Sequence, residues 1–252
     1  MTSADNLRVE RRHSTVLVGL DRPEKRNALD EATVNEFLAV LDEHAREPSV
    51  LVIHSTTPGT FAAGADIAEL LGRGADDALR SINAGLFERL EAHRWPTIAA
   101  IDGWALGGGC ELALACDLRL ASPAARFGQP ELNLGIMAGA GGNWRLAQLV
   151  GLGLARRMLY TGAVVDADSA LGAGLVDALH PADELLDAAV ALGAEIAKRS
   201  WRALELTKLA LRIHRPATTT FDIVGQALLF ESEEKRDRMS AFIEKAERKG
   251  MT

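Results

Sequence analysis

Two glutamates of this chain, Glu111 and Glu131, have the sequence context of residues that carry out chemistry. Each stands next to a turn and within a stretch that is otherwise uncharged. A carboxylate in apolar surroundings destabilises a fold unless it is paired or used. Two carboxylates that face the same position can take up and deliver protons, which is the basis of general acid–base catalysis. Their spacing in the sequence does not show whether they face each other.

The residues before Glu111 predict a place that holds negative charge. An apolar run over residues 97–101 is followed by Gly107-Gly108-Gly109 and then by a second apolar run, an order typical of strand, glycine turn and helix start. Glycine lets the backbone approach a ligand, and the first N–H groups of a helix have no partner within it. Such groups suit an anion or a developing oxyanion. Tight packing of helix on strand is the structural alternative, and no phosphate-loop pattern completes the glycines.

A second turn of the same type precedes Asp66. In the segment FAAGADI, residues 61–67, small side chains lead into a helix start. The two turns could each supply one backbone N–H to the same oxygen.

The segment DRPEKRNAL, residues 21–29, carries a local positive cluster in an acidic protein, with Arg22, Lys25 and Arg26 close together. Pro23 and Asn27 mark it as a loop. It is either a solvated loop or a site for the phosphates of a ligand.

The elements that must position these residues alternate along the chain. Short buried strands are predicted over residues 14–20, 50–54, 97–101 and 117–121. Helices are predicted from the N-cap Asp30 to about residue 47 and over residues 77–93, and residues 127–131 are expected to form a loop. Alternation of short strands with helices is typical of an α/β fold with parallel pairing.

Beyond Pro181 glycine is sparse and helical spacing dominates. Four helices are predicted there, over residues 183–199, 201–215, 218–231 and 233–249. The organisation changes near residue 195, so we expect a core of residues 1–195 that contains the site and a helical region of residues 196–252. The apolar side chains of that region, including Phe221 and Phe242, are expected to contact the core or another subunit.

Composition excludes several classes of protein. Of the 252 residues 48% are hydrophobic, which is enough for a substantial core and too many for a disordered chain. The net charge of −7, without a basic block, argues against a nucleic-acid partner. No apolar run reaches the ~18 residues of a membrane span, so we expect a cytoplasmic protein with no membrane partner. Cys110 and Cys116 are expected to be buried free thiols, and no metal is expected because the six histidines lack metal-ligand spacing.

Five motifs, in this order, resemble those of the enoyl-CoA hydratase/isomerase family, the crotonases. They are DRPEKRNAL from residue 21, FAAGADI from 61, ALGGGCELALACDLRLAS from 105, FGQPELNLG from 127 and GAGG from 139. The resemblance is strong over about residues 14–180 and weak over the helical C-terminus. It implies an α/β fold, a crotonase-like spiral of ββα units with a C-terminal helical region that forms homo-trimers, often paired into hexamers. It also implies acyl-CoA thioester substrates.

The resemblance assigns roles to individual residues. Ala65 and Gly108 match the two N–H donors of the family's oxyanion hole, while Glu111 matches its first catalytic glutamate and Glu131 its second. The positions that match substrate-binding segments of the family are Lys25, Arg26, Ala28, Ala63, Asp66 and Ile67. The implied reaction adds water across the C2–C3 double bond of a 2-enoyl-CoA, with Glu111 as the usual base and Glu131 as the usual proton donor. No metal or redox cofactor is implied, because CoA is part of the substrate.

The chain also departs from the family pattern near the expected acyl pocket. Met137-Ala138 stand where hydratases of the family often have proline, and Asn143-Trp144 stand where Thr-Gln is common. Two alternatives stay open: a Δ3-Δ2 enoyl-CoA isomerase or other crotonase-family acyl-CoA enzyme, and a non-catalytic acyl-CoA-binding protein. Isomerases commonly keep one of the two carboxylates and a binding protein needs neither, so the presence of both favours hydration.

Overall fold

The computed structural model describes residues 6–72 and 82–212 of the chain. The chain divides into two compact units, residues 1–197 and 198–252. In the second unit the described element is helix α9 (Trp201–Arg212), in which Arg202 pairs with Glu205. The predicted helices over residues 218–231 and 233–249, and the apolar side chains that they carry, lie outside the described residues. Within the described ranges, every helix is too short or too polar to span a bilayer.

Six strands form the larger sheet of the first unit, in the order β1-β2-β3-β5-β7-β10. Their bounds are Leu7–Arg12, Thr15–Leu20, Val50–Ser55, Thr97–Ile101, Leu118–Ala121 and Ala178–Leu179. The predicted strands correspond to β2, β3, β5 and β7, and these four pair in parallel as expected. Strand β1 was not predicted. It is an antiparallel edge strand whose charged residues face solvent, a composition that protects sheet edges but obscures the strand signal.

A second sheet consists of four short strands in the order β4-β6-β8-β9, none of which was predicted individually, although the resemblance implied ββα units. Its strands are Thr60–Ala62, Trp104–Leu106, Arg126–Gly128 and Val165–Asp166. The expectation of a loop over residues 127–131 is therefore wrong, since β8 ends at Gly128 and a 3-10 helix, η2 (Glu131–Leu134), follows. Strands of two or three residues are too short to show an alternating pattern.

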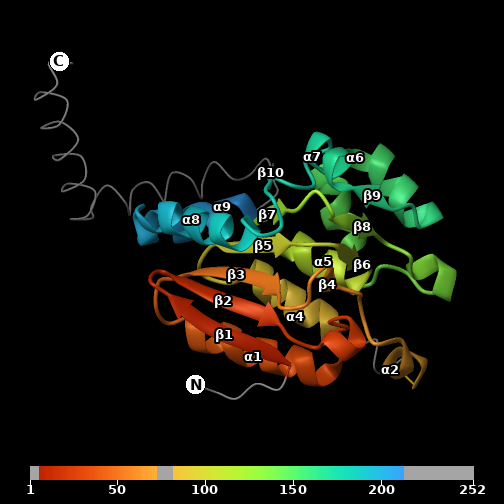
Figure 1. Cartoon of the computed structure of the whole chain (residues 1–252), viewed down its shortest axis with the longest axis horizontal. Helices are drawn as coiled ribbons and strands as arrows, with labels where there is room; N and C mark the ends of the chain where they lie inside the picture. The colour runs from red at the N-terminus through yellow and green to blue at the C-terminus, as the bar shows by residue number, and fades with distance from the viewer. Residues whose placement is uncertain (1–5, 73–81, 213–252) are drawn as a thin grey trace, which may run out of the picture. The chain divides into compact units, whose positions relative to one another are not determined.

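Consecutive strands cross from one sheet to the other. In the pairs β3–β4, β5–β6 and β7–β8, the first strand joins the larger sheet and the second joins the smaller one. Helical segments follow each pair: α2 (Ile67–Gly72) and α4 (Ile82–Glu91), then α5 (Gly108–Ala115), then η2 and α6 (Gly142–Thr161). The chain therefore advances as a spiral of ββα turns, which can be followed by colour in Figure 1.

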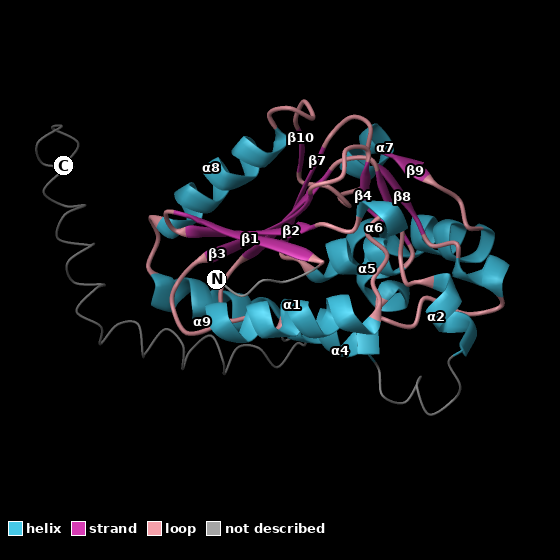
Figure 2. Cartoon of the chain, turned by 60° about the horizontal axis from the view of Figure 1, so that its bottom comes forward, coloured by secondary structure: helices cyan, strands magenta, loops and turns pink. Residues whose placement is uncertain are grey.

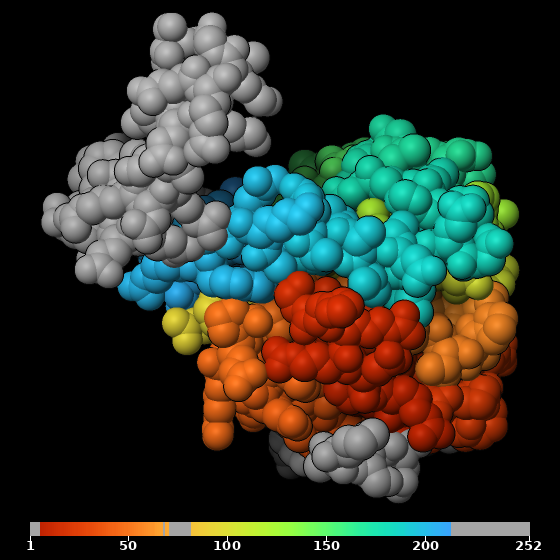
Figure 3. Space-filling view, turned by 60° about the vertical axis from the view of Figure 1, so that its left-hand side comes forward, coloured from red at the N-terminus to blue at the C-terminus, as the bar shows by residue number. Residues whose placement is uncertain are grey.

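Helices cover both faces of the larger sheet. In Figure 2, α8 (Leu185–Ala197) lies on one face, and α1 (Glu31–His44) and α4 lie on the other. Strand β2 is buried along its whole length, as expected for a strand covered on both sides. Helix α1 begins as predicted, because the Asp30 side chain accepts a hydrogen bond from the Thr33 N–H at 2.8 Å. Figure 3 shows the face on which α8 borders the N-terminal strands. The remaining short helices are η1 (Pro23–Lys25) and α7 (Ala167–Gly172).

Candidate active site

Three parallel strands of the smaller sheet end next to the candidate residues and bring them together at one edge of the sheet. Strand β4 leads into Gly64-Ala65, β6 leads into Gly107-Gly108, and β8 leads through Pro130 into Glu131. β6 pairs in parallel with both β4 and β8. The carboxyl ends of parallel strands lie at the same edge of a sheet, which is where open α/β sheets bind their ligands. The smaller sheet, whose individual strands were not predicted, thus brings the candidate residues together.

The two small-residue turns lie so close together that a side chain on either would touch the other. A Cβ placed on Gly108 would lie 3.4 Å from the Ala65 nitrogen, and one placed on Gly64 would lie 3.0 Å from the Leu106 carbonyl oxygen. Gly64 has a φ of +104°, which L side chains rarely adopt. Gly108 is the first residue of α5. The N–H of Ala65 and that of a helix start are therefore neighbours, as two donors to a single oxygen must be.

Gly109 supports the packing explanation for the glycine run. A Cβ at this position would lie only 2.2 Å from the Ala62 carbonyl oxygen, so a side chain would push α5 away from β4. The close packing is at Gly109, whereas the predicted N–H donor is Gly108, so the two explanations are compatible.

Glu111 is buried in the first turn of α5 and is held by two backbone donors. Its Oε1 accepts hydrogen bonds from the N–H groups of Ala140 and Gly142, each at 2.8 Å. Burial raises the pKa of Glu111, while those two N–H groups and the positive charge of Arg145 act in the opposite direction. The sequence predicted this carboxylate but not its partners, which lie about one spiral turn further along the chain.

Glu131 is also buried, as the first residue of η2. A Cβ on Gly107 would lie 3.1 Å from Glu131 Oε1, so this carboxylate stands directly against the glycine turn. Burial raises the pKa of Glu131 to about 7. The negative charge of Glu111 also raises this pKa, whereas a hydrogen bond from the backbone N–H of Glu131 itself lowers it. With its amide nitrogen turned toward the carboxylate, buried Gln129 donates to both oxygens of Glu131 at 2.8 and 3.1 Å.

A cavity of about 970 Å³ contains both carboxylates and both turns. Of the predicted site residues, the structure brings six together around it: Ala63, Ala65, Ile67, Gly108, Glu111 and Glu131. The rest of its lining is mainly apolar and includes Leu70, Ile82, Leu132, Leu134, Ile136 and Met137. A large apolar cavity with a few convergent polar groups is the usual form of a small-molecule site.

The remaining predicted residues, Lys25, Arg26, Ala28 and Asp66, lie on or against the adjoining loop. Backbone bonds join this loop to the first turn, from the Leu29 N–H to the Gly64 carbonyl (2.8 Å) and from the Ala63 N–H to the Arg26 carbonyl (3.0 Å). Lys25 and Asp66 line a separate, open cavity of about 320 Å³.

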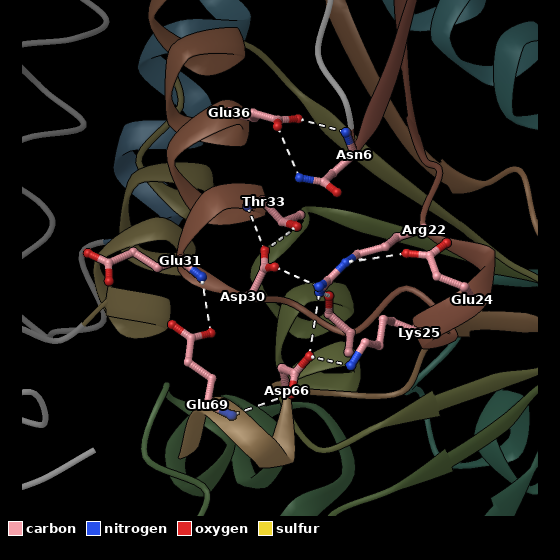
Figure 4. Close-up of polar contacts among 11 residues, drawn as sticks. Asn6, Arg22, Glu24, Lys25, Asp30, Glu31, Thr33, Glu36, Asp66 and Glu69 are labelled. Carbon is pink, nitrogen blue, oxygen red and sulfur yellow. Dashed lines mark hydrogen bonds and ion pairs between the residues drawn. The ribbon is translucent and has the colours of Figure 1, made fainter. Parts of the chain in front are cut away.

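An ion-pair network crosses this junction (Figure 4). Arg22 pairs with Asp30 at 2.8 Å and with Asp66 at 3.8 Å, and Lys25 pairs with Asp66 at 3.6 Å. Two of the three loop cations are thus engaged with carboxylates inside the protein. Part of the positive cluster predicted from the sequence therefore holds the loop in place.

Sequence reasoning missed the contributions of three polar residues at or near the cavity. Gln129 was seen only as part of a motif, Asn83 reaches the cavity from α4, and Arg145 lies behind the turn that holds Glu111. Gln129 and Asn83 carry no charge, and the position of all three depends on tertiary contacts. The nearness of Gln129 to Glu131 was the one local signal.

Cys110 and Cys116 are buried free thiols, as predicted. Burial, together with the charges of Glu111 and Glu131, raises the pKa of Cys110. Over the described part of the chain, no three His, Cys, Asp or Glu side chains are grouped so that they could hold a metal ion.

The chain matches the model of the enoyl-CoA hydratase/isomerase family over residues 10–249. It is 37% identical to the short-chain-enoyl-CoA hydratase of Clostridium acetobutylicum, covering 98% of this chain and 97% of that protein. It is 38% identical to the 2,3-dehydroadipyl-CoA hydratase of Escherichia coli (94% and 95%) and 36% identical to the crotonyl-CoA hydratase of Syntrophomonas wolfei (96% and 96%).

Solved structures give the same result for the fold. A structure of the enoyl-CoA hydratase of Bacillus anthracis superposes with a TM-score of 0.90 at 31% identity, covering 95% of this chain and 96% of that one. A hydratase subunit structure from Geobacillus kaustophilus gives a TM-score of 0.91 at 36% identity, covering 95% of each chain. The ββα spiral is therefore the crotonase fold. The chain belongs to the enoyl-CoA hydratase/isomerase family.

Proposed function

We propose that this protein is an enoyl-CoA hydratase, a hydro-lyase that adds water across the C2–C3 double bond of a 2-enoyl-CoA thioester. The observation that carries the proposal is the pair of buried carboxylates, Glu111 and Glu131, in one cavity with the turns of Ala65 and Gly108. Relatives named as hydratases of short-chain enoyl-CoA and crotonyl-CoA support the same reaction. An isomerase that moves a double bond would need a single base at this place.

In this mechanism the two turns stabilise the enolate. As water adds at C3, negative charge develops on the thioester oxygen. The N–H groups of Ala65 and Gly108 would donate to that oxygen, and donors of this kind are each worth about 3–4 kcal/mol of transition-state stabilisation. Because both are backbone groups fixed by glycine packing, they need little reorganisation when the charge forms.

The two glutamates differ in the way that acid–base catalysis requires. Burial raises the pKa of Glu131 to about 7, so a substantial fraction of this carboxyl group carries a proton near neutral pH, which it would deliver to C2. Glu111 has two N–H donors and a buried cation that favour its ionised form, so it is the better base for the attacking water. Environments that push the pKa values of two carboxyl groups apart assign them to different roles. The mechanism needs no further cofactor, because CoA belongs to the substrate.

CoA recognition is proposed for the loop of Lys25, Arg26 and Ala28. This loop is bonded to the first turn through Ala63, so a ligand that binds it would also be aligned with the Ala65 N–H. Lys25 would then exchange its ion pair with Asp66 for a phosphate contact. We further propose that residues 196–252 form the trimer contacts, and that the protein is cytoplasmic, which its buried free thiols support.

Hydration of crotonyl-CoA, followed by the loss of conjugated thioester absorbance, tests the proposal. Glu111→Gln and Glu131→Gln should each lower kcat by about 10²–10⁴-fold, the usual contribution of a general acid or base. KM should stay within a few fold, because the backbone donors remain. The double variant should lose much less than the product of the single losses, since the two residues act as a unit.

Two outcomes would contradict hydration by a carboxylate pair. Single variants that hydrate crotonyl-CoA at the parental rate would exclude it. One essential glutamate beside one dispensable glutamate, with turnover of a 3-enoyl-CoA, would identify an isomerase instead.

A further inference from the structure

A buried cation lies behind the turn that holds Glu111. Arg145 stands in the first turn of α6, and its side chain is only 3% exposed. Its Nη1 donates to the Ala140 carbonyl at 2.9 Å, and its Nη2 donates to Glu91 Oε2, on α4, at 2.7 Å. The guanidinium also lies over the ring of Trp144, 4.3 Å from its centre. Arginine uses this fork of donors to fix two acceptors at once.

The same residue, Ala140, contacts both Arg145 and Glu111. Its carbonyl is held by Arg145, while its N–H donates to Glu111 Oε1. The second donor to that oxygen, the Gly142 N–H, lies two residues further on. A single buried guanidinium therefore fixes the turn that supplies both hydrogen bonds to the carboxylate.

Gly141 makes room for this arrangement. It has a φ of +106°, and a Cβ at this position would lie 2.0 Å from Arg145 Nη1. Any other residue would displace the guanidinium. The glycine at position 141 therefore leaves the space in which the Arg145 guanidinium contacts the Ala140 carbonyl.

We propose that Arg145 is a positioning residue for Glu111, holding the Ala140–Gly142 turn so that its two N–H groups fix the carboxylate that acts as base. The proposal deepens the hydratase function and takes the role of Glu111 from it. Arg145 acts through the turn, and Glu91 in turn fixes Arg145 from α4.

A purely structural role for the Arg145–Glu91 pair would have a different signature. The charged and titratable groups around Glu111 are Glu131 from η2, Cys110 from its own helix and Arg145 from α6, with Glu91 behind Arg145. Losing Arg145 removes a positive charge and frees the two N–H donors, and both changes raise the pKa of Glu111. Losing Glu91 breaks the same ion pair but leaves the cation, so the pKa of Glu111 should not rise. If the Arg145–Glu91 ion pair only stabilised the fold, removing either partner would change the pKa of Glu111 equally.

The experiment compares Arg145→Met, Arg145→Lys and Glu91→Gln in the full chain. Carboxyl ¹³C NMR titration of glutamate-labelled protein, with Glu111→Gln to assign the signal, measures the ionisation of Glu111 without turnover. We expect Arg145→Met to raise the pKa of Glu111, Arg145→Lys to raise it less, and Glu91→Gln to leave it unchanged or lower it. With crotonyl-CoA, kcat of Arg145→Met should fall by about 10²-fold with KM nearly unchanged, as for a misplaced catalytic group.

An unchanged Glu111 titration in Arg145→Met would overturn the inference, and so would equal shifts in Arg145→Met and Glu91→Gln. If Arg145→Met does not fold, the pKa of Glu111 is compared between Arg145→Lys and Glu91→Gln instead, and equal shifts would again overturn the inference. Because the titration does not depend on activity, failure of the parent to hydrate any 2-enoyl-CoA would count against the proposed function and leave this test intact.

Discussion

Glu111 and Glu131 are chemically identical side chains that their surroundings make different. Two backbone N–H donors fix one oxygen of Glu111, whereas Glu131 lies against a glycine turn, accepts hydrogen bonds from the Gln129 side chain and has a pKa of about 7. The proposed hydration takes a proton from the water that attacks C3 and delivers a proton to C2, a pair of tasks that calls for this asymmetry. The difference comes from the burial of Glu131 beside the charge of Glu111, and from the two backbone N–H groups and the Arg145 cation at Glu111.

The raised pKa of Glu131 has a consequence for stability. Between the unperturbed value of 4.5 and about 7, the folded chain holds a proton that the unfolded chain has lost. The stability that this proton contributes is complete below the lower value and is lost as the pH rises through the upper one. Glu131→Gln cannot ionise, so its free energy of unfolding should not show this loss. Relative to the parent, the free energy of unfolding of Glu131→Gln should therefore rise by about 1–2 kcal/mol as the pH is raised from about 5 to about 8, after allowance for solvent screening.

Urea denaturation of both proteins at the two pH values measures this gain. Glu43→Gln, which removes an exposed carboxylate from α1, is the matched control for the loss of one charge. A stability difference between Glu131→Gln and the parent that is the same at both pH values would show that Glu131 ionises as it does in the unfolded chain.

At the scale of elements, the close approach of α5 to β4 keeps the two donor turns together. Gly109→Ala should lower the free energy of unfolding by about 1–3 kcal/mol, because its Cβ would lie 2.2 Å from the Ala62 carbonyl oxygen. It should also lower kcat by about 10²-fold, since the turns would separate. Chemical denaturation and crotonyl-CoA turnover measure the two effects.

Gly85→Ala is the matched control for that change. Gly85 lies inside α4, and a Cβ there would have no atom within 4 Å. This substitution should stabilise the protein by about 0.5–1 kcal/mol, because alanine loses less backbone entropy in a helix, with kcat unchanged. If Gly109→Ala behaves like Gly85→Ala, the contact between α5 and β4 is looser than the structure indicates.

The elements also show what a sequence can predict. Runs such as Val50–Ile53 and the capped helix after Asp30 were predicted correctly, because their apolar pattern or cap lies within a few neighbouring residues. The smaller sheet was missed because its strands have two or three residues and gain their stability from pairing across the spiral. Glu111 and Glu131 could be proposed from motifs, but Arg145 and Asn83 could not, since only the fold brings them near the cavity.

At the scale of the whole molecule, we expect the protein to assemble. Large apolar side chains are exposed on α6, among them Leu152 and Tyr160, at 58% and 69%. Burial of such surface against another subunit is a common source of oligomer stability. Light scattering at low micromolar concentration should give three or six times the chain mass of 27.0 kDa. A mass of one chain would contradict both the trimer and the proposed role of residues 196–252.

The spiral also fixes the order in which the segments of the candidate site are completed as the chain is synthesised. The first donor turn follows β4, the second follows β6, Glu131 follows β8, and the amides that hold Glu111 arrive with the start of α6. A ribosome that has released the chain only as far as Ala115 has produced Glu111 as a carboxylate with no N–H partners, in an unfinished core. We therefore expect Glu111 to become buried only when the last spiral turns have folded. Premature termination before Gly142 should give a chain that chaperones and proteases recognise as unfolded.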